Sequence, residues 1–215
     1  MIRRFASAVV LALLQSAAFA DGHAVGIKAG ALGLGVEYTH ELNERFAVRA
    51  GINGSQIGFD GEESGIDYDI SVVWDSFSVA VDLHPMKTAL RVTAGILGND
   101  NGLQIESRPT TNVTIGDTSY TPTQVGTLTG LVGFGDSAPF LGVGWDWSRG
   151  KRFGMSLDLG VLDQGSPRVD LSATGTLLGD PAFQADIATE EAELTDSFGD
   201  LDVVPYLTLG FVFRF

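Results

Sequence analysis

Apolar and polar residues alternate along most of this chain. In residues 206–215, YLTLGFVFRF, every second position from Leu207 onward is leucine or phenylalanine, and most residues between them are small or polar. Similar alternation occurs in residues 46–53, 141–147 and 153–161. A period of two residues is typical of β-strands with one apolar face. The pattern therefore predicts an all-β protein.

Eight strands and their connections can be placed on this pattern. The connections at 41–44, 84–87 and 148–151 are short and polar, and they alternate with a Gly-rich corner near Gly33 and with three longer segments. Short turns at one end and long loops at the other are typical of outer-membrane barrels, with both termini on the periplasmic side. We therefore predict an eight-stranded antiparallel transmembrane β-barrel. Its strands are expected near 23–31, 33–40, 45–57, 67–83, 88–99, 139–147, 152–162 and 203–215, and its loops at 58–66, 100–138 and 163–202.

One segment of the last loop has helical features instead. Asp180 can cap a helix that has Pro181 at its first position, and Gly199 can end it. We therefore expect one short amphipathic helix within 180–199, folded against the barrel mouth or the membrane interface. A lid or plug that controls access to the lumen is the alternative. The apolar face of this helix would carry Phe183, Ile187, Leu194 and Phe198.

The first twenty residues have the features of a secretory signal peptide. Arg3 and Arg4 precede a short apolar run, and Ala18-Phe19-Ala20 resembles a cleavage site before Asp21. The apolar run is shorter than the roughly 20 residues that a membrane-spanning helix needs. We therefore predict a cleaved signal peptide at 1–20, an outer-membrane barrel domain at 21–215, and export to the outer membrane.

The charges on the second face of the strands argue for a barrel over a soluble sandwich. If the apolar face is turned toward lipid, four basic and four acidic side chains point inward. An eight-stranded barrel is just wide enough for its interior side chains, and buried charges must be paired. A sandwich would leave these charges in water and would need no balance between them. The predicted interior charge network is Lys28, Glu37, Arg49, Asp82, Arg91, Asp146, Asp158 and Arg214.

The remaining charge is concentrated in the expected loops. The formal net charge is −14, and the three expected loops, together with residues 67–69 at the start of the following strand, hold 19 acids against only Arg108 and Arg168. This balance argues against a nucleic-acid partner, which requires clustered basic residues. Asp60, Glu62 and Glu63 are weak candidates for Ca²⁺ ligands, although a solvated acidic loop is the simpler interpretation. Divalent ions could also bridge such acids to lipopolysaccharide. The absence of cysteine excludes disulfides and thiolate metal sites.

Together, the signal peptide, the alternation and the terminal strand resemble the small outer-membrane β-barrel superfamily of Gram-negative bacteria. The resemblance is to its opacity-type and outer-membrane-protein-A-like eight-stranded members. It implies that Phe211, Phe213 and Phe215 form the insertion signal that the barrel-assembly machinery reads. It also implies contact with outer-membrane lipid and lipopolysaccharide and, by analogy, a monomer. It identifies no subfamily and no ligand.

Three functions are compatible with such a barrel. A closed scaffold would have an envelope-structural role or would bind partners through acidic extracellular loops. A porin-like channel or transporter would favour cations through those loops. An outer-membrane lipid-modifying enzyme is the third possibility, but His23, His40 and His84 lack a serine and a carboxylate at an evident triad spacing, so we predict no catalytic residue and no cofactor. Interior volume for solutes could come from Gly26, Gly51, Gly95, Gly142, Gly144, Gly154 and Gly160.

Overall fold

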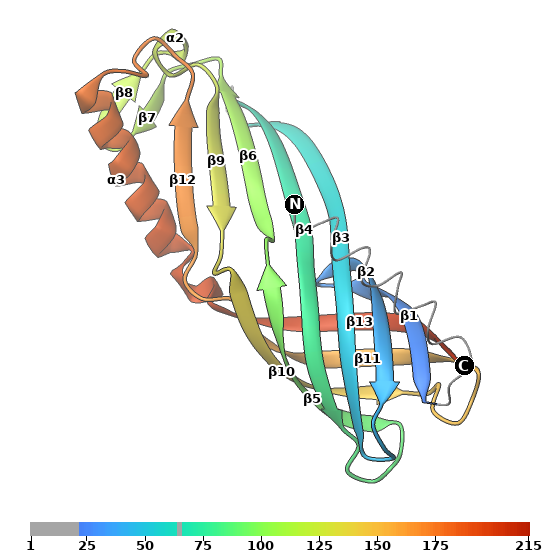
Figure 1. Ribbon diagram of the computed structural model, residues 1–215. Coiled ribbons are helices and arrows are strands. Elements are labelled where there is room, and N and C mark those ends of the chain that lie inside the picture. Colours follow the sequence, from blue (N-terminus) through green and yellow to red (C-terminus); the bar gives the residue numbers. More distant parts are fainter. Residues whose placement is uncertain (1–21, 64–65) are drawn as a thin grey trace.

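Eight antiparallel strands close into a barrel, as the alternation predicts (Figure 1). The computed structural model describes residues 22–63 and 66–215, so the predicted signal peptide lies outside the described residues. Each barrel strand pairs with its neighbours in the ring, and the pairing of β4 with β5 closes it. In ring order the strands are β1 (His23–Gly30), β2 (Gly33–Glu41), β3 (Phe46–Glu63), β4 (Ile66–Leu83), β5 (Leu90–Asn99), β10 (Ser137–Asp146), β11 (Phe153–Asp163) and β13 (Val203–Arg214).

The outside of this barrel is apolar. In the lower half of β4, for example, Phe77 and Val79 point outward and are about half exposed, whereas Ser78 and Asp82 point inward and are buried. A water-soluble sandwich would bury its large apolar side chains, whereas a transmembrane barrel turns them toward lipid. No helix among the described residues is long and apolar enough to cross a membrane. The outward belt includes Ile27, Leu34, Val81, Ile96, Leu141, Val143, Phe153, Met155, Leu207, Leu209 and Phe211.

The two ends of the barrel differ in their connections. The three short turns and the C-terminus lie at one end, where the Phe215 backbone N–H donates to the His23 carbonyl at 3.1 Å. At the other end β1 and β2 are joined by only two residues, Ala31 and Leu32. Gly33 follows with a φ of +81°, and a Cβ there would lie 2.6 Å from the Ser55 hydroxyl oxygen. This tight turn therefore requires glycine, because of the positive φ and because of the close approach of Ser55.

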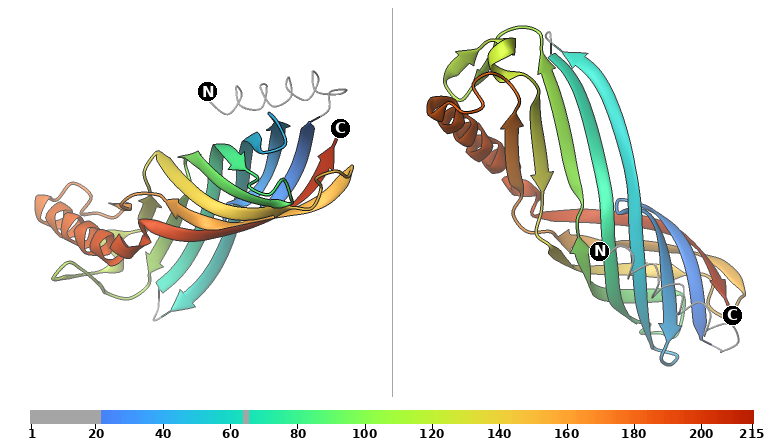
Figure 2. Two further views of the ribbon diagram at one scale, coloured as in Figure 1. Left: turned by 90° about the horizontal axis from the view of Figure 1, so that it is seen from below. Right: turned by 45° about the horizontal axis from the view of Figure 1, so that its top comes forward.

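β3 and β4 continue well beyond the barrel. Residues 76–83 of β4 pair with β5, but residues 66–73 pair with β6 instead, and β9 and β12 extend that sheet (Figure 2). The connections expected at 58–66, 100–138 and 163–202 therefore contain strands of an external sheet, which the expected layout lacks. We call residues 54–73 together with the elements inserted after β5 and β11 the arm. Those elements are β6 (Gly102–Pro109), β7 (Val113–Ile115), β8 (Thr118–Tyr120), α2 (Pro122–Val125), β9 (Leu128–Gly133), β12 (Arg168–Ala173), α3 (Pro181–Ser197) and the 3-10 turn η1 (Gly199–Leu201).

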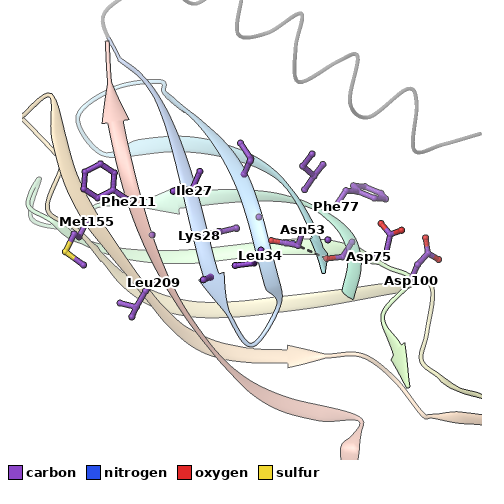
Figure 3. Close-up of a pocket in the computed structure, with 17 residues that line it drawn as sticks. Ile27, Lys28, Leu34, Asn53, Asp75, Phe77, Asp100, Met155, Leu209 and Phe211 are labelled. Atoms are coloured by element: carbon purple, nitrogen blue, oxygen red, sulfur yellow. Dashed lines mark hydrogen bonds between the residues drawn. The ribbon is translucent and has the colours of Figure 1, made fainter. Parts of the chain in front are cut away.

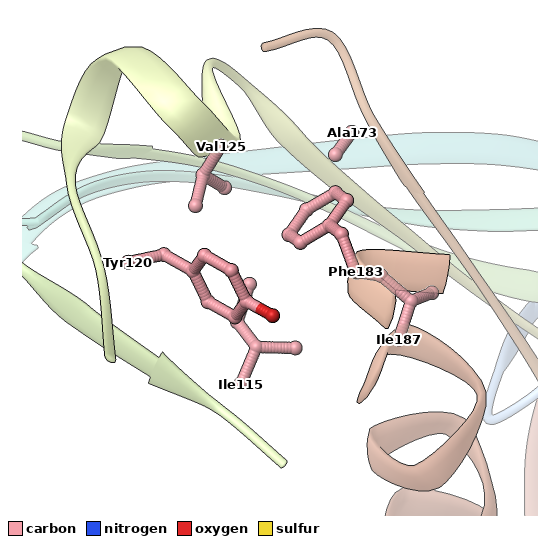
Figure 4. Close-up of a cluster of buried hydrophobic side chains, with 6 residues drawn as sticks. All are labelled: Ile115, Tyr120, Val125, Ala173, Phe183 and Ile187. Atoms are coloured by element: carbon pink, nitrogen blue, oxygen red, sulfur yellow. The ribbon is translucent and has the colours of Figure 1, made fainter. Parts of the chain in front are cut away.

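The arm has a small hydrophobic core of its own (Figure 4). Phe183 and Ile187, one turn apart on α3, are buried against Ile115 and Tyr120 of the β7–β8 hairpin and Val125 of α2. The rings of Phe183 and Tyr120 meet edge to face, with 4.9 Å between their centroids. This core covers the lumen-side face of β9 and β12, because Leu128, Leu171 and Ala173 on that face pack against it.

The predicted helix is confirmed as α3, but its position corrects the expectation for it. The Asp180 carboxylate accepts from the backbone N–H groups of Ala182 and Phe183, as an N-cap does. The helix packs on β12 and the β7–β8 hairpin, along the side of the arm. It therefore neither plugs the lumen nor lies on the barrel mouth.

Two carboxylates attach α3 to the rest of the arm. Asp186 accepts a hydrogen bond of 2.6 Å from the Tyr120 hydroxyl, which lowers the pKa of this carboxyl below its ordinary value. Glu191 accepts from the backbone N–H of Leu171 at 2.6 Å. The second bond satisfies a donor on the outer edge of β12, so that edge is covered by the helix.

We expect Phe183→Ala to loosen the arm and leave the barrel intact. Loss of a fully buried phenylalanine typically costs about 3–5 kcal/mol, here against local opening of the arm core. Hydrogen exchange should accelerate in residues 113–125 and 181–197, while the heat-dependent gel shift of the folded barrel is unchanged. The exposed Phe59→Ala is the matched control. Loss of the gel shift would show that arm and barrel unfold as one unit.

Candidate functional site

Eight charged lumen side chains, one on each barrel strand, form the main part of an ion-pair network. These are the eight residues that the inward face predicts, and the structure brings all of them into one connected network. Around the ring they are Lys28 on β1, Glu37 on β2, Arg49 on β3, Asp82 on β4, Arg91 on β5, Asp146 on β10, Asp158 on β11 and Arg214 on β13.

Arg49 is the centre of this network. Its guanidinium lies 3.0 Å from Glu37, 2.8 Å from Asp82 and 3.3 Å from Asp158. β3 and β11 are four strands apart in a ring of eight, so the pair between Arg49 and Asp158 joins opposite walls. Arg49 is 4% exposed and Asp82 is 1% exposed. Asp158 is buried as well, so the ion pair between Arg49 and Asp158 crosses the lumen in a region from which water is largely excluded.

Arg91 extends the network along the barrel. One of its terminal nitrogens donates to both oxygens of Asp158, at 2.9 and 2.8 Å, and its guanidinium lies 3.8 Å from Asp146. Thr93, on the same strand, donates to Asp82 at 2.7 Å and accepts from Arg49 at 3.1 Å. Both arginines therefore contact Asp82 and Asp158, and the Thr93 hydroxyl links Arg49 to Asp82.

At the end with the short turns, the network includes residues that the sequence did not reveal. Arg214 contacts Asp146 at 2.5 Å and Glu41 at 2.6 Å, and Arg149 contacts Glu41 at 3.3 Å. Ser148 accepts from Arg214 at 2.7 Å. The polar run at 41–44 predicts a turn that includes Glu41, but Glu41 has the same odd-numbered parity as the inward-facing Glu37, and this is the signal that identifies it.

At the arm end, apolar side chains fill the lumen. Leu97, Ala138, Leu162 and Tyr206 form a buried cluster, and the Phe140 ring packs edge to face on Tyr206. Leu32, from the β1–β2 turn, and Val204 pack against them. We call these seven residues the apolar plug. The lumen is thus occupied by ion pairs over one part of its length and by the apolar plug over another.

The interior glycines make room for these side chains. A Cβ at Gly142 would lie 2.5 Å from the Tyr206 hydroxyl oxygen, and one at Gly160 would lie 2.6 Å from its ring. A Cβ at Gly144 would lie 2.5 Å from an Asp158 oxygen. The expected free volume at these three glycines is therefore already filled by the plug and the charge network.

The described part of the chain lines two hollows beside the barrel. The larger, about 990 Å³, has both lumen-facing Lys28 and Asn53 and outward-facing Ile27 and Leu34 in its lining (Figure 3). Because successive strand residues point to opposite faces, this lining covers both sides of the wall, so the volume is not that of one internal chamber. The smaller hollow, about 330 Å³, lies between the plug and the base of the arm, where Trp74 is among the lining residues.

The three phenylalanines of the predicted insertion signal lie on the outside of the barrel, and the three histidines lie near its short-turn end. Phe211, Phe213 and Phe215 follow the outward face of β13, where the Phe213 and Phe153 rings lie 5.0 Å apart. His23 and His40 stack with 4.5 Å between ring centroids at the end with the short turns, and His84 follows β4 at the same end.

The metal candidates lie on the upper part of β3. Asp60 and Glu62 are exposed there, and Glu63 is the last residue of the strand. Asp60 stands opposite Asp69, which is bound by Arg108 at 2.6 Å. In residues 22–63 and 66–215, no group of three or more histidine or acidic side chains is arranged to hold a metal ion.

Comparison with known proteins identifies the fold. No protein-family model and no curated protein sequence matches the chain. Among solved structures, CarO of Acinetobacter baumannii superposes with a TM-score of 0.60 at 20% identity, over 89% of this chain and 97% of that one. CarO2 of the same organism gives 0.61 at 19% identity, over 91% and 99%. The chain therefore has the fold of the small eight-stranded outer-membrane barrels.

We expect Arg49→Leu to destabilise the barrel by about 3–5 kcal/mol, because it leaves Glu37, Asp82 and Asp158 short of a buried partner. Urea unfolding of the refolded protein in detergent measures this. Arg108→Leu, which removes an exposed arginine that also contacts two carboxylates, should change stability by no more than about 1 kcal/mol. If the two substitutions lowered the free energy of unfolding equally, the lumen network would not be what stabilises the barrel.

Proposed function

We propose that this protein is an integral outer-membrane protein whose closed barrel anchors an acidic binding arm at the cell surface. The observation that carries the proposal is the filling of the lumen by cross-wall ion pairs and by the apolar plug. A channel needs a continuous polar path of sufficient width. Here the pair between Arg49 and Asp158 and the packing around Tyr206 lie in the way of such a path.

The shape of the arm supports a binding role. Loops that only connect barrel strands need not be ordered, whereas this arm has a five-stranded sheet, a 17-residue helix and its own core. Binding residues are often placed on segments that a rigid scaffold positions. The barrel supplies such a scaffold, because β3 and β4 run without interruption from the barrel into the arm.

The proposed orientation follows from the asymmetry of the two ends. Outer-membrane barrels have short periplasmic turns and longer extracellular segments. The three short turns are at the end opposite the arm, so the arm would be extracellular and the charge network would continue to the periplasmic rim through Glu41 and Arg149.

Planar-bilayer recording of the refolded mature protein tests the closed lumen. We expect no discrete conductance steps from a sample that shows the heat-dependent gel shift of a folded barrel, because ion pairs and the apolar plug obstruct the lumen. Steps that are cation-selective and proportional to the amount of folded protein would contradict the proposal and favour a pore.

Cysteine labelling tests the membrane location and orientation. The chain contains no cysteine, so Asp117→Cys in the arm and Asn43→Cys in a short turn each introduce a single thiol. On intact cells a membrane-impermeant maleimide should label the arm variant and spare the turn variant, and both should react after lysis. Labelling of the turn variant alone would show the reverse orientation.

A further inference from the structure

The upper part of β3 is an open edge of the arm sheet. β2 pairs with β3 only as far as Asn53, and Gly33 at the start of β2 lies beside Ser55. Beyond this point, none of the described strands pairs with that side of β3. We call residues 56–62 the free edge, which is about 24 Å long at the usual rise of a strand.

An open edge presents backbone donors and acceptors that another strand can use. Elsewhere in the arm such an edge is covered, since Glu191 of α3 takes the backbone N–H of Leu171 on the edge strand β12. The free edge has no comparable cover among the described residues, and Gly58 and Gly61 carry no side chain there. It is therefore the part of the arm where an added strand fits without displacing anything described.

The two faces at this edge have different chemistry. In the barrel, odd-numbered residues of β3 point to the lumen, so in the arm Ile57 and Phe59 lie on the lumen-side face. They are 47% and 59% exposed, although their cross-strand partners Val72 and Ile70 are also apolar. One face of the edge is therefore apolar across two strands and lacks a cover over β3.

The opposite face is acidic across the same two strands. Asp60 and Glu62 are exposed there, and their cross-strand partners are Asp69 and Asp67. Arg108 contacts Asp69 at 2.6 Å and compensates part of this charge. A strand added beside β3 would place alternate side chains next to the apolar and the acidic face, since strand residues point alternately to the two sides.

We infer that the free edge binds an extended peptide segment of a partner protein in which apolar and basic residues alternate. The backbone pairs with residues 56–62, the apolar side chains cover Ile57 and Phe59, and the basic side chains meet Asp60 and Glu62. Strand addition of this kind obtains its affinity from main-chain hydrogen bonds and its specificity from alternate side chains. A second copy of the chain would present the same acids, so the charge favours a basic partner.

This inference rests on the proposed role of the arm as a binding surface, and a synthetic probe tests it directly. The probe is a labelled octapeptide of alternating lysine and valine, with blocked termini, titrated into the refolded full-length mature protein in detergent and followed by fluorescence anisotropy. We expect saturable binding that weakens with salt. A peptide with four lysines followed by four valines, and an alternating glutamate–valine peptide, should bind at least tenfold more weakly.

Backbone methylation separates strand addition from charge attraction. Only alternate peptide groups of an added strand face the edge, so methylating one set of alternate backbone nitrogens should abolish binding, whereas methylating the other set should preserve it. Asp60→Asn with Glu62→Gln should weaken binding about three- to tenfold, because two cross-strand charge pairs are lost. The matched control, Asp117→Asn with Asp196→Asn, removes the same charge elsewhere in the arm and should leave affinity unchanged.

Several results would overturn the inference. These are the absence of binding by a folded sample, equal binding of the alternating and blocked-order peptides, equal binding of the two methylated peptides, or a dimer of the protein itself that occupies the edge in sedimentation. The outcome is distinguishable from failure of the proposed closed scaffold. If the protein conducts no ions and binds no peptide, only the inference about the free edge is contradicted. If it conducts ions and binds the peptide, only the proposal of a closed lumen is contradicted.

Discussion

The rest of the structure depends on the requirement that buried charges be paired inside a narrow barrel. Each of the eight strands contributes at least one charged side chain to the lumen, and Arg49 joins carboxylates on neighbouring and opposite walls. A one-residue slip of any strand would turn its charge toward lipid and leave its partners unpaired. The network therefore fixes the register of the ring as well as filling its interior.

The position of the arm follows from that fixed register. β3 and β4 remain paired with each other over their full length of 18 residues, although their other partners change where the barrel ends. Above that level β4 exchanges β5 for β6, while β3 has no further partner on its other side among the described strands. The same pair of strands thus belongs to a membrane barrel and to an external sheet, and the direction of the external sheet is set by the barrel.

The barrel could be predicted from the sequence because its physical requirements are local and repeated. Alternation placed the eight strands, and the same alternation assigned the eight charged side chains to the inner face. Glu41 and Arg149 could not be placed in the network by a pattern that assumes turn side chains to be exposed to water. In the structure the lumen network continues to the rim and includes both. The helix was predictable because Asp180 and Pro181 are strong local signals, but its packing was not, since the β7–β8 hairpin that receives it is far away in the sequence.

The arm sheet was missed although weak signals for it exist. Leu103 and Ile105 alternate with polar residues, as do Val169 and Leu171, but these runs are short and lie between polar segments. Short strands of this kind gain their stability from partners distant in the sequence, so single-strand patterns underestimate them. The apolar plug was also beyond local patterns, because it combines the β1–β2 turn with side chains from four barrel strands, β5, β10, β11 and β13.

The two long insertions that build most of the arm leave and re-enter the barrel at nearly the same place. The Asn99 backbone N–H donates to the Asp136 carbonyl at 2.9 Å, and the Gln164 N–H donates to the Asp202 carbonyl at 2.8 Å. Each inserted segment is therefore closed at its base, and the barrel strands on either side already stand at hairpin distance. The geometry makes these segments modules in the topological sense: they can differ in length, sequence or fold without altering strand number, tilt or stagger in the part that crosses the membrane.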